Sequence, residues 1–321
     1  SRGLGDVYKR QESPGMKNLF RQLKPRCLQD IGDANALYRP GPMGEIPHYI
    51  ARRFKKEEVA YPHEDLKEIL EPTYGIMIYQ EQLMQVVQKI AGFSLSKADN
   101  LRRAISKKDF DLMASIKNDF IEGALKNGYS QKQVNEIFAL IEKFADYGFN
   151  KSHAIAYGLI AYQLAYLKAN HPLAFYGAIL SNEQNSDVHK MEYIAEAKKY
   201  RIRVLPPSIN YSTNRFEQVE GDLRFSLLGI KNVGQAGYQA IVEEREKNGL
   251  FKDIFDFISR MDGKKVNTMM LESLIDAGAF DEFELNRATL KANLEKIGEY
   301  ANLKNTIGID LSLIHISEPT R

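Results

Sequence analysis

The segment from Lys151 to Pro172 joins a polar start to a long apolar run. Lys151, Ser152 and His153 stand side by side, and the residues that follow, up to Leu167, carry no charge. A solvated helix would instead carry polar side chains along one whole face. The run is shorter than the roughly 20 residues that span a bilayer, and proline cannot continue a helix. The segment therefore predicts a buried helix of a soluble protein, with its amino end facing an anion.

The first and last eleven residues are related at the level of DNA. One DNA sequence that encodes residues 1–11 has a reverse complement that encodes residues 311–321, in frame and without mismatch. That DNA resembles the adapter of a sequencing library, and such a repeat is implausible in a natural protein. We exclude both ends as artefacts and expect residues 12–310 to be an internal piece of a longer protein.

Bulk charge predicts no partner, because the end residues account for the net charge of +2. Those residues are Arg2, Lys9, Arg10 and Arg321 against Asp6 and Glu318. Local charge is more informative: five basic residues fall between Lys97 and Lys108, against Asp99 alone.

Cys27 is the only cysteine, which excludes disulfides within the chain and indicates a reducing, cytoplasmic compartment.

Helix signals dominate up to about Tyr200. They are glycines that bracket residues 76–91, a cap at Ser96, an asparagine–glycine stop at 127–128 and a capping box of Ser130 with Gln133. Short β-like runs at 202–205 and 223–228 follow, around Pro206. We therefore predict a mainly α fold, with one domain over residues 12–205 and a smaller domain with short strands over residues 206–310.

Two groups of residues are candidates for binding phosphate. In LRRAISKK, Arg103 and Lys107 are four residues apart and share a helix face with Arg102 nearby, so several cations can meet one polyanion. In NKSHAIAY, the first helical turn has unpaired N–H groups and a positive dipole end. Lys151 adds charge there, and Tyr157 adds a ring one turn on. The alternatives are a solvated helix face for the first group, and a core histidine with a flexible rim lysine for the second.

Two further stretches carry weaker signals. In ALYRPGPM, two prolines stiffen a turn that presents Arg39, either to nucleic acid or only to redirect the chain. In GIMIYQEQLMQVV, Gln80 and Glu81 stand at a helix start. Glu81 either orients an arginine or belongs to a simple helix cap.

The stretch LLGIKNVGQAGYQAIVEE has the pattern of a helix-hairpin-helix, in which a tight turn leads into a helix whose first N–H groups bind a DNA phosphate. Its hairpin is Lys231, Asn232, Val233 and Gly234, and asparagine stands where glycine is usual. Asparagine enters the left-handed region more readily than most residues. LESLIDAGAF is a weaker candidate, and plain helical packing explains it as well.

Several chemistries lack a signature. The sequence contains no Walker A loop, no dinucleotide fingerprint, no paired Cys or His with zinc spacing and no nucleophilic serine or cysteine in a known setting. Its many acidic residues form no convincing metal-binding cluster.

Five blocks, in order, resemble the fingers region of the C-family replicative DNA polymerases of bacteria, the polymerase III alpha subunits. They are ALYRPGPM, PTYGIMIYQEQLMQ, AGFSLSKADNLRRAISKK, FADYGFNKSHAIAYGLIAYQLAYLKANHP and LLGIKNVG. The resemblance covers essentially residues 12–310. It implies a DNA-directed DNA polymerase, a nucleotidyltransferase, whose fingers close over the incoming deoxynucleoside triphosphate (dNTP).

The resemblance implies roles for the residues already named. Arg102, Arg103 and Lys107 resemble residues at the triphosphate, and Lys151, Ser152, His153 and Tyr157 resemble a second wall of the same pocket. Arg39, Gln80 and Glu81 are expected to be structural or close to substrate. The hairpin at Lys231–Gly234 resembles a duplex-holding motif that leads into the clamp-binding domain.

The resemblance also indicates what lies elsewhere. The family's metal-binding aspartates belong to the palm, so we expect no catalytic or metal residue here, an inactive fragment, and Mg²⁺ only in the intact enzyme. Expected partners are primer–template DNA and dNTP, with the sliding clamp and replisome reached through the parent, and no membrane. Two alternatives are a free-standing helix-hairpin-helix DNA-binding protein and an unrelated phosphate-ester enzyme, which would need an acid, base or metal cluster.

Overall fold

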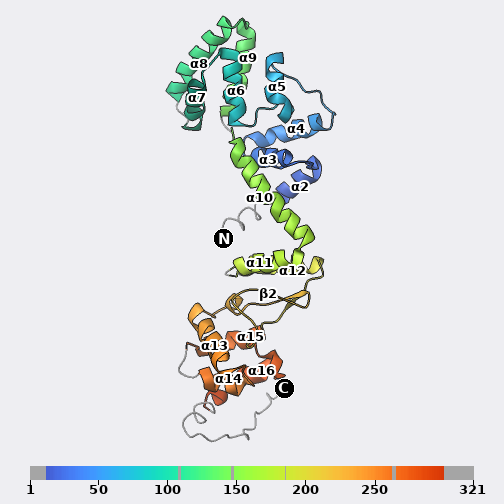
Figure 1. The fold of residues 1–321 in the computed structure, drawn as a ribbon, viewed down its shortest axis with the longest axis vertical. Coiled ribbons are helices and arrows are strands. Elements are labelled where there is room, and N and C mark those ends of the chain that lie inside the picture. Colours follow the sequence, from blue (N-terminus) through green and yellow to red (C-terminus); the bar gives the residue numbers. More distant parts are fainter. Residues whose placement is uncertain (1–11, 108–109, 146–147, 185, 262–264, 300–321) are drawn as a thin grey trace. The chain divides into compact units, whose positions relative to one another are not determined.

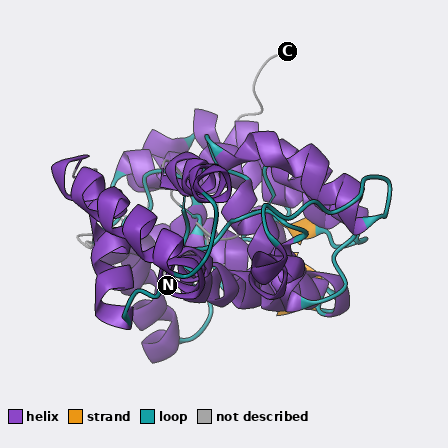
Figure 2. Cartoon of the chain, turned by 90° about the horizontal axis from the view of Figure 1, so that it is seen from above, coloured by secondary structure: helices purple, strands orange, loops and turns teal. Residues whose placement is uncertain are grey.

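The computed structural model describes residues 12–107, 110–145, 148–184, 186–261 and 265–299. Both end segments assigned to the adapter lie outside these residues. Helices make up most of the described chain and a small sheet accompanies them (Figure 2). The prediction of a mainly α fold with short strands is confirmed.

The chain forms two compact units, residues 6–164 and a second unit that runs from residue 165 onward. The division lies inside helix α10 (Lys151–Asn170), about forty residues before the change in composition at Pro206. The helix that follows, α11, packs on two strands from beyond Pro206, and these contacts group it with them. The domain limits 12–205 and 206–310 stay a prediction.

The first unit is built from short helices followed by four longer ones. The helices are α2 (Pro14–Leu23), α3 (Leu28–Leu37), α4 (Ile46–Arg53), α5 (Lys67–Leu70), α6 (Gln80–Ala91), α7 (Leu95–Lys107), α8 (Phe110–Lys126) and α9 (Gln131–Ala145). Helices α6 to α9 pack side by side (Figure 1). Their apolar faces share a core that includes Leu83, Ile90, Phe120 and Phe144, because each helix carries apolar residues at helical spacing.

Most predicted helix ends are confirmed. The Ser130 and Gln133 side chains bond each other's backbone N–H at 3.4 and 2.9 Å, a capping box. Helix α8 ends at Lys126 before Gly128, whose φ is +92°. The predicted cap at Ser96 is wrong: α7 begins at Leu95 and Ser94 caps it, since the Ser94 hydroxyl accepts from the N–H of Lys97 at 3.2 Å.

The helix predicted from residue 76 begins only at Gln80. Residues 76–79 are buried and extended, because the Gln82 side chain holds the backbone there. Its Oε1 accepts from the N–H groups of Ile78 and Tyr79 at 2.9 and 3.0 Å, and its Nε2 donates to Thr73 Oγ1 at 2.7 Å. Apolar periodicity could not separate this buried extended run from the helix that follows it.

Helix α10 is present as predicted, but the prediction that it is buried is wrong. Its buried residues are Ala154, Gly158 and Ala161, a small-residue stripe that lies against α3 near Gly32. Large apolar side chains are exposed, among them Tyr162 at 54%. Small residues allow the close approach of the two helices, and half-buried Ile155 packs beside them on Gly32. The large side chains on the other faces of α10 stay exposed. No helix of the described residues is long and apolar enough to cross a membrane.

The second unit combines helices with a three-stranded sheet. Its helices are α11 (Pro172–Asn182), α12 (Asp187–Lys199), α13 (Gln235–Asn248), α14 (Ile254–Met261), α15 (Thr268–Ala277) and α16 (Arg287–Ala292). Its strands are β1 (Val204–Leu205), β2 (Glu217–Val219) and β3 (Asp222–Arg224), in the order β1-β3-β2. Strand β3 pairs with β1 in parallel and with β2 antiparallel. Helices α13 to α15 and Leu290 of α16 share a second core.

Candidate nucleotide and DNA-phosphate sites

The start of α10 is held by the segment before α6. Phe149 donates its N–H to the Ile78 carbonyl at 3.2 Å, and its own carbonyl accepts from the N–H of Gln80 at 2.9 Å. Glu81, one residue further on, accepts from the backbone N–H of Lys151 at 3.0 Å. These bonds fix residues 148–151 on the first turn of α6, although some 70 residues separate them in sequence.

Glu81 therefore caps α10 rather than its own helix, an arrangement that the sequence did not indicate. Its carboxylate also accepts from Asn150 Nδ2 at 3.0 Å, and Asn150 Oδ1 accepts from the N–H of His153 at 2.8 Å. A carboxylate of the chain already complements the positive helix end. An external anion at this end consequently meets the side chains of Lys151, Ser152 and His153, rather than the N–H of Lys151.

A row of rings runs from half-buried Phe149 to the exposed His153 and Tyr157 on the first two turns of α10. The Arg39 guanidinium lies 4.2 Å from the Phe149 ring centroid. The Phe149 ring meets His153 edge-on at 5.4 Å, and the His153 ring lies 4.4 Å from Tyr157. Lys151, the first residue of α10, contacts a different ring: its Nζ lies 5.7 Å from the centre of the Tyr79 ring.

This row brings together residues that the sequence placed in separate stretches. Arg39 comes from the RPGP turn, where its Nε donates to the Ala36 carbonyl at 2.9 Å. Phe149 was missed by the sequence reasoning, although it directly precedes the Asn-Lys-Ser-His run. Cations and an exposed face of rings, such as Tyr157 at 39% exposure, suit a ligand with both phosphate and base.

The basic residues of α7 are partly neutralised. Arg102 and Arg103 both bind the Asp99 carboxylate, at 2.7 Å each. The hydrogen bond from Arg102, and then the charges of both arginines, lower the pKa of Asp99. Lys97 pairs with Asp119 at 2.8 Å, while Arg103 and Lys107 stay exposed. Lys108 lies outside the described residues.

A buried polar cluster beneath the first unit's surface was not predicted. The Asp33 carboxylate accepts hydrogen bonds from Tyr49, Tyr79 and Gln29, the last at 2.6 Å, and Asp33 is fully buried. Burial raises the pKa of Asp33, against the opposing effect of these hydrogen bonds. The cluster ties α3 to α4 and to the extended residues that hold Phe149. Asp33 is not exposed itself, but through Tyr79 it holds the backbone that pairs with Phe149.

The hairpin of the second unit has the predicted left-handed turn. Asn232 has φ +65° and its side chain donates to Ser273 Oγ at 2.9 Å. Val233 is 7% exposed and packs in the core, and Gly234 precedes α13 with open space above it. The element directly before the hairpin is a short 3-10 turn, Leu227–Gly229, rather than an α-helix. The exposed residues, Lys231, Asn232 and Gly234, leave the start of α13 accessible to a phosphate.

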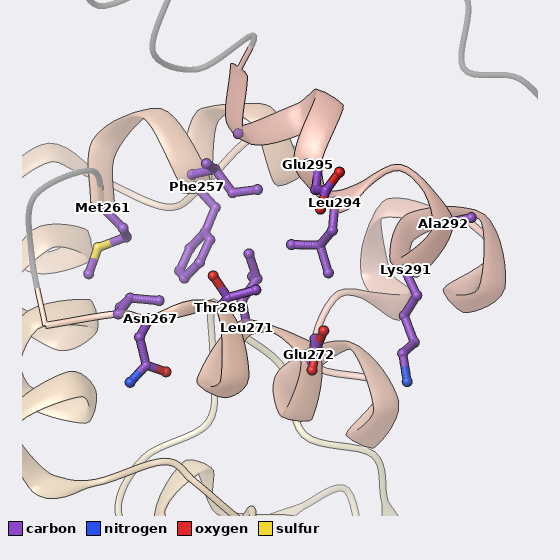
Figure 3. A pocket seen from close by; sticks show the side chains of 13 residues that line it. Phe257, Met261, Asn267, Thr268, Leu271, Glu272, Lys291, Ala292, Leu294 and Glu295 are labelled. Atoms are coloured by element: carbon purple, nitrogen blue, oxygen red, sulfur yellow. The ribbon is translucent and has the colours of Figure 1, made fainter.

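A cavity of about 520 Å³ lies among α14, α15 and the residues after α16. Phe257, Leu271 and Leu294 point toward one another across it, while Lys291 points away (Figure 3). None of the predicted site residues lines it. Within the described ranges, no group of three or more His, Cys, Asp or Glu side chains is placed to hold a metal ion.

Two family models match the chain. The finger domain of the bacterial DNA polymerase III alpha subunit matches residues 10–128, and a helix-hairpin-helix motif matches residues 201–290. The first match contains the α7 cations but ends before α10. The second contains the hairpin. The predicted finger region and the predicted helix-hairpin-helix region are therefore each supported by a separate family model.

Relatives with the name DNA polymerase III subunit alpha match most of the chain. The protein of Bacillus subtilis is 48% identical over 292 residues, 91% of this chain and 26% of that protein. The protein of Borreliella burgdorferi is 49% identical over 288 residues, 90% of this chain and 25% of that protein. The chain thus spans about a quarter of the length of these curated relatives. We conclude that it belongs to the bacterial DNA polymerase III alpha subunit family, as a segment with the finger domain and the helix-hairpin-helix region.

Proposed function

We propose that this chain is the part of a replicative DNA polymerase that binds the incoming dNTP and the primer–template DNA. The observation that carries the proposal is the row at the start of α10, where Arg39, Phe149, His153 and Tyr157 contact one another in succession and Lys151 opens the same helix. Cations suit the triphosphate, and rings suit the base and sugar. Membership of a polymerase family supports the same assignment.

In the proposed mechanism the chain positions the nucleotide and neutralises its charge. Arg102, Arg103 and Lys107 on α7, together with Lys151, would hold the phosphates so that the reacting phosphorus stays in line. They would also offset the charge that develops on the leaving pyrophosphate. Ser152, His153 and Tyr157 would form the wall beside the nucleotide. Lys231, Asn232 and Gly234 would bind a phosphate of the duplex.

Other parts of the polymerase complete the proposal. The described residues do not fit a magnesium site, so we assign no metal ligand and no metal-dependent step to them. We propose that the rest of the polymerase holds Mg²⁺, which activates the primer hydroxyl in such enzymes. Contacts with the sliding clamp and the replisome, and a cytoplasmic setting, follow from the same assignment as proposals.

Lys151→Ala or Arg103→Ala, in the intact polymerase, should lower kcat/KM for dNTP by about 10- to 100-fold, the loss of one charged hydrogen bond to phosphate. Affinity for primer–template DNA should change less than about twofold, because duplex phosphates are bound elsewhere. Steady-state primer extension and DNA titration measure the two quantities. Lys126→Ala, an exposed lysine at the end of α8, is the control. Unchanged kcat and KM in both variants would contradict the proposal.

A further inference from the structure

A cavity of about 420 Å³ opens in the first unit, away from the start of α10. It lies where the connection between α2 and α3 meets the end of α4, and Arg26, Arg53, Phe54, Lys55 and Tyr74 line it. Cys27 and Asp30 complete the lining, so it has three cationic side chains, two aromatic rings, one carboxylate and one thiol. The cavity contains none of the residues assigned above to dNTP or to the duplex.

The floor of the cavity is a buried ion pair that is already satisfied. Arg53 and Asp30 have side chains only 8% and 7% exposed, and Arg53 NH2 donates to Asp30 Oδ2 at 2.7 Å. Arg53 also donates to Tyr74 Oη at 3.3 Å. Burial alone would raise the pKa of Asp30, but hydrogen bonds from Arg53 and from the N–H of Arg26 outweigh it and lower the pKa. The pair therefore provides a rigid, neutral base rather than binding charge.

The rim carries cations that no acidic side chain of the described residues neutralises. Arg26 and Lys55 are exposed, and among the described residues no acidic side chain pairs with either. Lys24 and Lys56, next to them in sequence, are exposed as well. By contrast, Arg52 on the same helix as Arg53 is paired with Glu57 at 2.8 Å. The rim thus concentrates positive charge above a neutral floor.

Strained backbone surrounds the same cavity. Lys24, Lys55 and Tyr74 have φ of +48°, +57° and +53°, in the left-handed region that disfavours residues with a side chain. Glycine would remove this strain at each position. Lys55 and Tyr74 line the cavity, and Lys24 lies next to it, because its carbonyl accepts from Arg53 NH2 at 3.5 Å. Such strain gathers at ligand sites.

The aromatic rings of the cavity indicate which kind of polyanion would bind there. Phe54 and Tyr74 are half-exposed, and Tyr49 fixes the Tyr74 ring by edge-on contact at 5.0 Å. Cations beside fixed rings bind single-stranded nucleic acid, because unpaired bases stack on rings while phosphates meet the cations. Duplex bases are stacked on one another and cannot use the rings. We propose that this cavity binds a nucleotide unit of single-stranded DNA; its identity as template strand rests on the proposed function.

The test is fluorescence-anisotropy titration of the full chain with labelled oligothymidylate, over a salt series. The variant is Arg26→Ala with Lys55→Gly, because glycine at position 55 removes the charge and also relieves the left-handed strain. We expect binding at least about fivefold weaker and a salt slope smaller by roughly 1.4, for two lost phosphate contacts. The melting temperature should stay equal or rise, which separates lost binding from lost folding.

Lys126→Ala with Lys132→Ala is the matched control, since it removes two exposed cations from α8 and α9. It should leave affinity within about twofold, as loss of charge far from the site does. Oligothymidylate binding that is absent in the wild type or unchanged in the variant would overturn the inference. An equal loss for duplex DNA would overturn the single-strand assignment. The proposed function is tested separately, by dNTP kinetics of the Lys151 and Arg103 variants. The proposed function and the single-strand site can therefore fail independently.

Discussion

Replacement of Asp33 by alanine should lower the free energy of unfolding by about 3–5 kcal/mol. Tyr49 and Tyr79, both buried, and half-exposed Gln29 donate to this carboxylate. Each buried donor without an acceptor costs about 1–3 kcal/mol. The estimate is below the full sum because the variant no longer buries a carboxylate. Urea unfolding of the chain, followed by far-UV circular dichroism, measures the change.

Asp33→Asn is the matched control, because it keeps the shape and one acceptor oxygen. We expect a smaller loss, of about 1–2 kcal/mol. Burial raises the pKa of Asp33, so the folded chain holds its proton more tightly than the unfolded chain. The stability that Asp33 adds over asparagine is therefore fully present below its ordinary pKa and falls as pH rises through the raised value. A difference that grows with pH would show that the hydrogen bonds outweigh burial.

Gln82→Met should lower the free energy of unfolding by about 2–4 kcal/mol. Methionine nearly matches glutamine in shape, but it cannot accept from the N–H groups of Ile78 and Tyr79 or donate to Thr73. Two buried N–H groups would then lack a partner. The same urea experiment applies, and a change below about 1 kcal/mol would contradict this account of the extended segment.

Gln85→Met provides the comparison, because Gln85 lies on the same helix and is exposed. It should change stability by less than about 0.5 kcal/mol. Gln82 also fixes the backbone that pairs with Phe149, so its loss should disturb the ring row as well. In the intact polymerase we therefore expect Gln82→Met, but not Gln85→Met, to weaken dNTP use.

The sequence correctly predicted those structural features that depend only on neighbouring residues. The capping box of Ser130 with Gln133, the stop before Gly128 and the left-handed Asn232 are all determined within a few residues, and all are confirmed. The blocks that resemble the polymerase family also predicted the family correctly. Such features need no knowledge of the tertiary fold.

Features that depend on distant residues could not be predicted. Glu81 caps a helix that begins 70 residues later, and the Asp33 cluster joins side chains from three separate segments. The apolar run of α10 predicted burial, yet α3 covers only one face of that helix, its small residues and Ile155. Each outcome depends on which segments meet in space, and hydrophobic periodicity does not contain that information.

The most direct test of the proposed function is an exchange of segments. Residues 12–310 would replace the matching segment of the Bacillus subtilis subunit, to which the chain is 48% identical, and template-directed incorporation of dNTP would be measured. The account predicts incorporation within about tenfold of the unexchanged subunit, equivalent to about 1.4 kcal/mol in the barrier. A chimera that folds and binds primer–template DNA but incorporates no nucleotide would contradict it.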